Sequence, residues 1–186
     1  RRETVPMSSP PETTDVPWAL SPEDRDQPAA RVFALVLEAH LEEFRRRELL
    51  VRSGEDAADL HKYRVVIRRT RSLLASGDGV FPPEELSLLS AMAAQLAALT
   101  SPVRDLDVLL EDLDDRVEPV AERLRVGLPE LRTQLLLDRA HCRNALTSAL
   151  DGDFSVVLLR RWQTMASVYR VGGTEPGPDA RRRGVR

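Results

Sequence analysis

Apolar residues recur at intervals of three and four positions over most of the chain, from Ala29 to about Tyr169. This spacing places them on one side of an α-helix, whereas a half-buried strand would alternate apolar and polar residues. No segment shows that alternation, so we predict an all-α protein, an antiparallel helical bundle with short connections. The expected helices cover residues 29–51, a segment around 60–74, 82–99, 102–117, a long periodic segment 119–150 and 154–169.

Polar residues and prolines mark the expected helix ends. Ser53, followed three residues later by Asp56, predicts a capping-box-like start of the second helix. Thr100, Ser101 and Pro102 predict a stop and a new N-cap, which divides the third helix from the fourth. The apolar side of the first helix is expected to include Val32, Leu35, Val36, Ala39, Phe44 and Leu49.

The two ends of the chain differ in composition from its middle. Residues 1–28 are rich in proline, serine, threonine and acids, which predicts a linker or tail. Residues 29–171 form the expected helical domain, and residues 172–186 a flexible basic tail. Because the first residue is arginine and the first methionine is Met7, we expect the sequence to be part of a longer chain.

Composition narrows the class of function. The single cysteine, Cys142, excludes a disulfide framework and fits a reducing compartment, so we expect a cytoplasmic protein. No stretch approaches the roughly 18 to 20 uninterrupted apolar residues of a membrane span, and we expect no membrane partner. The sequence shows no metal-ligand spacing, Gly-rich phosphate loop or nucleophile motif. We therefore expect no enzyme, no metal and no cofactor.

One short stretch, His61 to Arg71, carries five Lys or Arg residues and no acid. The whole chain has a net charge of -3, so the other residues sum to -8, from 27 − 5 = 22 basic residues against 30 acidic ones. On a helical wheel the core side of this segment holds Leu60, Tyr63, Val66, Ile67, Thr70, Leu73 and Leu74. The other side holds one stripe of His61, Arg64, Arg68 and Arg71, a second stripe of Lys62 and Arg69, and Val65 between them.

This density of positive charge implies an anionic partner. Basic residues on an outer helix face usually pair with acids one turn away, but this stretch contains none. The partner is then either an acidic neighbouring helix or an external polyanion. Arginine predominates over lysine, and guanidinium groups bind phosphate in bidentate fashion. A repeating row of such groups suits a long ligand, either a nucleic acid backbone or inorganic polyphosphate.

Two further groups of charges have more than one interpretation. Arg104 and Asp107 lie three residues apart and can form a local salt bridge. Alternatively, Asp105 and Asp107 clamp arginines of the basic helix. The second group consists of Arg132, Arg139 and Arg143, and it is expected to be a solvated helix face or, alternatively, an addition to the anion-binding site.

Two segments of the chain resemble the motifs of the CHAD family, which is named for a conserved histidine in an α-helical domain. The first motif, H-x-x-R-V-x-x-R-R-x-R-S, reads HKYRVVIRRTRS from His61 to Ser72, and the second, R-D-x-D-V, reads RDLDV from Arg104 to Val108. The resemblance implies a domain of two pseudo-symmetric helical bundles whose basic helices face a cavity that binds inorganic polyphosphate. It also implies polyphosphate-binding roles for His61, Lys62, Arg64, Arg68, Arg69, Arg71 and Arg104.

Only one copy of the first motif is found. The nearest second candidate, AHCRNALTSAL from Ala140, has His141 and Arg143 but lacks the arginine run. We therefore expect the N-terminal half of a CHAD domain, which offers one wall of the cavity. The resemblance further implies an attached or associated CYTH-type triphosphatase domain and a location at polyphosphate granules. A homodimer is a way for a half-domain to rebuild the two-bundle form.

The expected function is non-catalytic binding of polyphosphate through the basic helix. One alternative is a nucleic-acid-binding module, against which stand the acidic net charge and the 4% of aromatic residues. The other is a protein–protein interaction scaffold whose basic helix pairs with acids inside the protein. Rescue by a charge swap between Arg68 and either Asp105 or Asp107 would support the scaffold, and chain-length dependence of binding would oppose it.

Overall fold

The computed structural model describes residues 27–54, 56–116 and 126–171. Most of the predicted linker and the whole predicted basic tail lie outside these residues. The helices within them are α1 (Ala29–Ser53), α2 (Ala57–Ala75), α3 (Pro83–Arg116), α5 (Leu128–Asp151) and α6 (Asp153–Val171). The described part of the chain contains no strand beyond an isolated bridge between Asp78 and Phe81. The prediction of an all-α helical bundle is confirmed.

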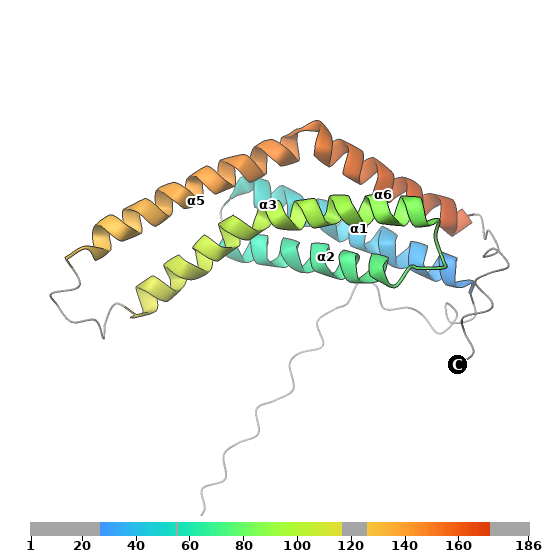
Figure 1. Cartoon of the computed structure of the whole chain (residues 1–186), viewed down its shortest axis with the longest axis horizontal. Coiled ribbons are helices and arrows are strands. Elements are labelled where there is room, and N and C mark those ends of the chain that lie inside the picture. Colours follow the sequence, from blue (N-terminus) through green and yellow to red (C-terminus); the bar gives the residue numbers. More distant parts are fainter. Residues whose placement is uncertain (1–26, 55, 117–125, 172–186) are drawn as a thin grey trace, which may run out of the picture.

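The bundle is built around α1 and α2. Helix α1 packs against α2 and α6, α2 packs against α3, and α3 packs against α5 and α6. Helices α5 and α6 meet at Gly152 in an open bend rather than a tight hairpin, as Figure 1 shows. As a result α6 packs along α1, while α5 lies beside the C-terminal part of α3.

The predicted core side of α2 is confirmed. Its buried residues are Leu60, Tyr63, Val66, Ile67, Thr70 and Leu74, and Leu73 is partly buried. The ring of Tyr63 packs on Phe44 of α1 at 4.8 Å between centroids, and Phe44 packs on Trp162 of α6 at 5.2 Å. The indole Nε1 of Trp162 donates to the Leu37 carbonyl at 2.9 Å, so this buried aromatic keeps a hydrogen-bond partner. With its core side fixed in this way, α2 turns its charged side outward.

The prediction for the apolar side of α1 is wrong apart from Phe44. The residues that α1 buries are Ala30, Ala34, Leu37, His40, Leu41, Phe44, Glu48 and Val51. By contrast, Leu49 is 70% exposed. Apolar residues surround α1 between residues 32 and 41, so their positions alone do not select a face. The choice follows from α2 and α6, which contact α1 along a stripe that also buries two polar side chains.

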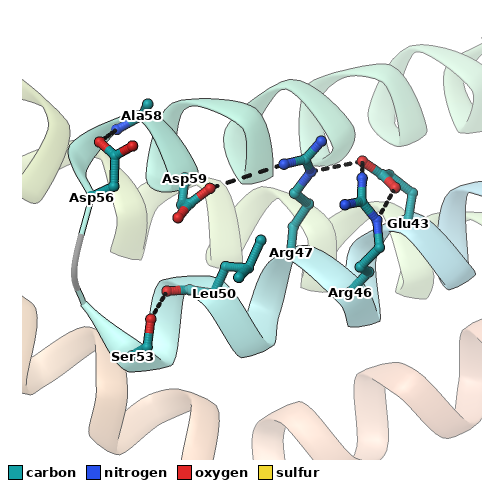
Figure 2. A network of polar contacts seen from close by, with 8 residues as sticks. All are labelled: Glu43, Arg46, Arg47, Leu50, Ser53, Asp56, Ala58 and Asp59. Carbon is teal, nitrogen blue, oxygen red and sulfur yellow. Dashed lines mark hydrogen bonds and ion pairs between the residues drawn. The ribbon is translucent and has the colours of Figure 1, made fainter. Parts of the chain in front are cut away.

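The connection between α1 and α2 differs from the predicted capping box. Gly54 has φ of 78°, a left-handed conformation that suits glycine and ends α1. The Ser53 hydroxyl donates back to the Leu50 carbonyl at 2.8 Å and therefore belongs to the end of α1 (Figure 2). Asp56 is the N-cap of α2, and its Oδ1 accepts the Ala58 N–H at 2.8 Å.

The predicted break at Pro102 is also wrong, because α3 runs without interruption from Pro83 to Arg116. Proline removes from the helical ladder the N–H that would otherwise donate to the Ala98 carbonyl, and it bends the helix. Leu96 and Val103 are buried on either side of the proline, so tertiary packing holds both segments in the core. Figure 1 shows α3 bending along its length.

By length and composition, the Pro83–Leu113 segment of α3 would suit a membrane span. It crosses the bundle, however, and Leu89, Leu96 and Val103 lie in the hydrophobic core. It also carries the buried carboxylate of Asp107. Helix α3 therefore packs one side into the bundle, and 28% of its most apolar segment is buried.

Candidate polyanion-binding pocket

A pocket of about 320 Å³ lies between α2 and α3 on the charged side of α2. Its lining from α2 consists of His61, Arg64, Val65, Ile67, Arg68 and Arg71. Its lining from α3 consists of Ala97, Thr100, Ser101 and Arg104. The α2 residues from His61 to Arg71 extend over about 15 Å of helix axis. The pocket is therefore an elongated basic surface with contributions from two helices.

The structure divides the predicted site residues into two groups. The pocket brings together the whole first stripe of α2 and the arginine of the second motif, namely His61, Arg64, Arg68, Arg71 and Arg104. Lys62 and Arg69 do not line it, because the 100° step between successive residues turns them away from α3. Arg69 lies instead on the side of His40 in α1. Burial and the nearby charge of Arg69 lower the pKa of His40 to about 4.

Arg64 is held at the base of the pocket by neutral oxygen atoms. Its Nη1 donates to Thr100 Oγ1 at 2.7 Å, to Ser101 Oγ at 3.0 Å and, at 3.4 Å, to the Ala97 carbonyl. The sequence predicted no role for Thr100 or Ser101 in the site, because they were assigned to a helix break. Nothing in the segment itself indicates this role, because the two hydroxyls face the basic stripe only when α3 continues through Pro102.

Arg68 and Arg71 are exposed, and neither forms a hydrogen bond or an ion pair within the described residues. Several arginines elsewhere in the bundle are neutralised. Figure 2 shows Arg46 and Arg47 bound to Glu43, with Arg47 Nη1 also 3.9 Å from Asp59 Oδ1. Carboxylates therefore balance the positive charge of Arg46 and Arg47, whereas the charge of Arg68 and Arg71 remains concentrated in the pocket.

Within the described residues, Arg104 forms an ion pair with one carboxylate. Its Nη1 lies 3.5 Å from Oε1 of Glu111, two turns further along α3. The Glu111 side chain is 58% exposed, so water screens this long contact. The predicted pair between Arg104 and Asp107 is not formed.

Asp107 points away from the pocket and pairs with Arg139 of α5. The alternative in which Asp107 clamps an arginine of the basic helix is therefore wrong. Arg143 donates to the Val51 carbonyl at 2.6 Å and lies over Gly54, and burial lowers its pKa. The predicted solvated face thus fails for Arg139 and Arg143, both of which tie α5 to other helices.

The described residues contain no group of three or more His, Cys, Asp or Glu side chains arranged to hold a metal ion. Among the described residues, the pocket lining includes no carboxylate and no Phe, Tyr or Trp side chain; its one aromatic ring is the imidazole of His61. Fold and site together define a helical module with a basic cleft suited to anions rather than to base stacking.

Comparison with known proteins assigns the family. Residues 35–184 match the CHAD domain, and the chain therefore belongs to the CHAD domain family. The crystal structure of the CHAD domain from the plant Ricinus communis is similar, with a TM-score of 0.61 and 28% sequence identity. The similarity covers 75% of this chain but 47% of that chain, so the protein spans about half the length of the solved domain. A search of curated proteins finds no match.

Proposed function

We propose that the protein is a non-catalytic module that binds inorganic polyphosphate in the pocket between α2 and α3. One observation carries the proposal: Arg68 and Arg71 share a pocket with His61, Arg64 and Arg104, and no carboxylate lines it within the part of the chain that the structure describes. Membership of the CHAD family supports the choice of polyphosphate among polyanions, through the ligand that the resemblance implies.

The chemistry of binding follows from the positions of these side chains. Arg68 and Arg71 each present a guanidinium group able to donate two parallel hydrogen bonds to one phosphate. Arg104 belongs to the α3 side of the pocket, whereas Arg68 and Arg71 belong to the α2 side. Contacts with successive phosphates release counter-ions, so affinity should fall steeply with salt.

Nucleic acid fits the same pocket less well. Sequence-tolerant binding of single strands relies on aromatic rings that stack on successive bases, and the described lining offers only the imidazole of His61. The net charge of -3 weakens the long-range attraction of either polyanion, so it does not distinguish nucleic acid from polyphosphate. The scaffold alternative is weakened because Asp107, one of its two acids, is already paired with Arg139.

The chain matches only 47% of the solved CHAD domain, and this shorter length affects how strongly it is expected to bind polyphosphate. Helix α5 buries only Leu146 and Leu150 among its described residues, and much of its length is uncovered. We infer that a second CHAD half, supplied by further chain or by another protomer, completes the binding cavity. A CYTH-type triphosphatase remains the proposed associated partner.

The proposal is tested by measuring binding of long-chain polyphosphate and of a DNA duplex at two salt concentrations. The wild type is compared with Arg68→Glu, and with Arg46→Glu as a control of equal charge change outside the pocket (Figure 2). We expect salt-dependent polyphosphate binding that Arg68→Glu abolishes and Arg46→Glu largely retains, with weaker DNA binding throughout.

Two results would overturn the proposal. Equal binding of polyphosphate and DNA would mean that the pocket attracts any polyanion by nonspecific electrostatics and does not select polyphosphate. Absence of polyphosphate binding by a folded wild type, in the presence or absence of a second CHAD half, would exclude the function itself.

A further inference from the structure

The base of the pocket is a small hydrogen-bond network between α2 and α3. The hydroxyls of Thr100 and Ser101 donate to the Ala97 carbonyl at 2.8 Å and 3.0 Å. Their own lone pairs then accept from Nη1 of Arg64 at 2.7 Å and 3.0 Å. The hydrogen bond to the Ala97 carbonyl thus fixes the orientation of each hydroxyl, and the oxygen lone pairs point toward Arg64.

This arrangement anchors Arg64 without neutralising it. A guanidinium group has five N–H donors, and those on Nε and Nη2 are not used by Thr100, Ser101 or Ala97. A carboxylate in the same place would have cancelled the charge that attracts an anion. Two neutral hydroxyls instead restrict the side chain and leave its full positive charge in the pocket.

The positions of the hydroxyls depend on α3 continuing through Pro102. Thr100 is fully buried at 0% exposure, and Ser101 is half-buried beside it. Both lie in the turn before the proline, where the loss of one backbone hydrogen bond loosens the ladder. The bend and the anchoring of Arg64 therefore occur at the same place in α3.

We propose that Thr100 and Ser101 are positioning residues that hold Arg64 ready for a phosphate ligand. The inference rests on the proposed function and adds that Arg64 is ordered before the ligand arrives. A long side chain that is already ordered loses less conformational entropy on binding, which improves affinity. Removal of the hydroxyls should weaken polyphosphate binding by about two- to tenfold, the equivalent of one immobilised side chain.

The decisive variants are Thr100→Val and Ser101→Ala, with Thr100→Ser as the conservative rescue. Valine keeps the shape of threonine and removes the hydroxyl, whereas serine keeps the hydroxyl. Binding of long-chain polyphosphate is measured against salt concentration for each variant and for Arg68→Gln. Thermal unfolding confirms that each variant is folded, and ¹⁵N NMR of arginine side chains reports whether the guanidinium of Arg64 is restricted without ligand.

We expect Thr100→Val and Ser101→Ala to lower affinity while keeping the salt dependence of the wild type, because no charge is removed. Arg68→Gln should instead reduce the slope of log affinity against log salt by about 0.7. This is the value for one lost phosphate contact with a single-stranded nucleic acid. Thr100→Ser should bind like the wild type. A restricted Arg64 signal should be lost in Thr100→Val and Ser101→Ala and kept in Thr100→Ser.

Wild-type affinity in both Thr100→Val and Ser101→Ala would overturn the inference, as would an Arg64 signal that neither variant changes. If Thr100→Val fails to fold, Ser101→Ala and Thr100→Ser still decide the matter. A wild type that binds no polyphosphate would reject the proposed function, and with it the role in binding. In that case the NMR signal would still show whether the hydroxyls hold Arg64.

Discussion

Arg139 of α5 donates a hydrogen bond from Nε to Oδ1 of Asp107 in α3, and the Asp107 side chain is only 2% exposed. The second oxygen of Asp107 is buried with no hydrogen-bond partner among the described residues. The carboxylate therefore depends on α5 for its compensation. This pair joins the two helices at a point only three residues beyond Arg104 of the pocket.

Removal of Arg139 should destabilise the protein. Arg139→Met leaves a buried carboxylate without its main partner, which should lower the free energy of unfolding by about 1–3 kcal/mol. Urea denaturation measures the change. The matched control is Arg46→Met, whose side chain is 57% exposed and whose ion pair should contribute less than about 1 kcal/mol. Equal losses in the two variants would show that the Asp107 pair contributes no more than a surface salt bridge.

The adjacent residues Arg68 and Arg69 should differ in their effect on polyphosphate binding. Arg68→Gln removes a guanidinium group from the pocket lining and should weaken binding about tenfold or more. Arg69→Gln makes the same change of charge outside the lining and should weaken it about twofold, through long-range electrostatics alone. Fluorescence anisotropy with labelled polyphosphate separates the two. Equal losses would mean that net charge, rather than the pocket, determines affinity.

Glu111 should act as an internal competitor for the ligand. Its Oε1 lies 3.5 Å from Nη1 of Arg104, so a phosphate must displace or share this contact. Glu111→Gln should tighten binding by about two- to fivefold, the range expected for an exposed ion pair. Glu84→Gln, on the exposed first turn of α3 and outside the pocket lining, makes the same change of net charge. The competition is refuted if both variants tighten binding equally.

The protein should become less stable as the pH is lowered, because His40 is protonated more readily in the unfolded state than in the folded state. Its folded-state pKa of about 4 lies below the ordinary value of 6.5, because the ring is buried and the positive charge of Arg69 is nearby. As the pH falls below 6.5, the unfolded state therefore takes up a proton before the folded state does. The free energy of unfolding should decrease by at most about 1.4 kcal/mol per pH unit until the pH nears 4.

His40→Gln tests this dependence because it removes the titrating ring beside Thr70, whose Oγ1 lies 3.2 Å from Nδ1. Between pH 6.5 and 4.5 the wild type should lose more stability than the variant, as measured by urea denaturation at fixed pH values. Parallel stability curves for the two proteins would contradict the assignment to His40.

Resemblance to two motifs predicted the family, and helical periodicity predicted the all-α class and the outward side of α2. In α2, the core side and the charged side are separated by helical periodicity alone, so Tyr63 and Arg68 were placed correctly before any packing was known. The resemblance of RDLDV to the second CHAD motif added Arg104. In α1 helical periodicity failed at Leu49, because apolar residues surround that helix and only its neighbours select the buried face.

Local signals were less reliable where tertiary packing opposed them. Pro102 has the features of a helix end, yet burial of Leu96 and Val103 outweighs the loss of one backbone hydrogen bond. Continuation of α3 then places Thr100 and Ser101 beneath Arg64, more than thirty positions away in sequence. Their contribution to the pocket has no signature within their own segment.

The sequence by itself determined that this chain is helical, that one helix carries a basic stripe with no acid in the same segment, and that this stripe matches a CHAD motif. These properties depend on the identity and spacing of residues within single segments. The tertiary structure decided which cations share the pocket with Arg104, and which acid Arg139 compensates. Such pairings depend on how helices distant in sequence pack, and the rotation of a helix about its axis is set by all of its neighbours together.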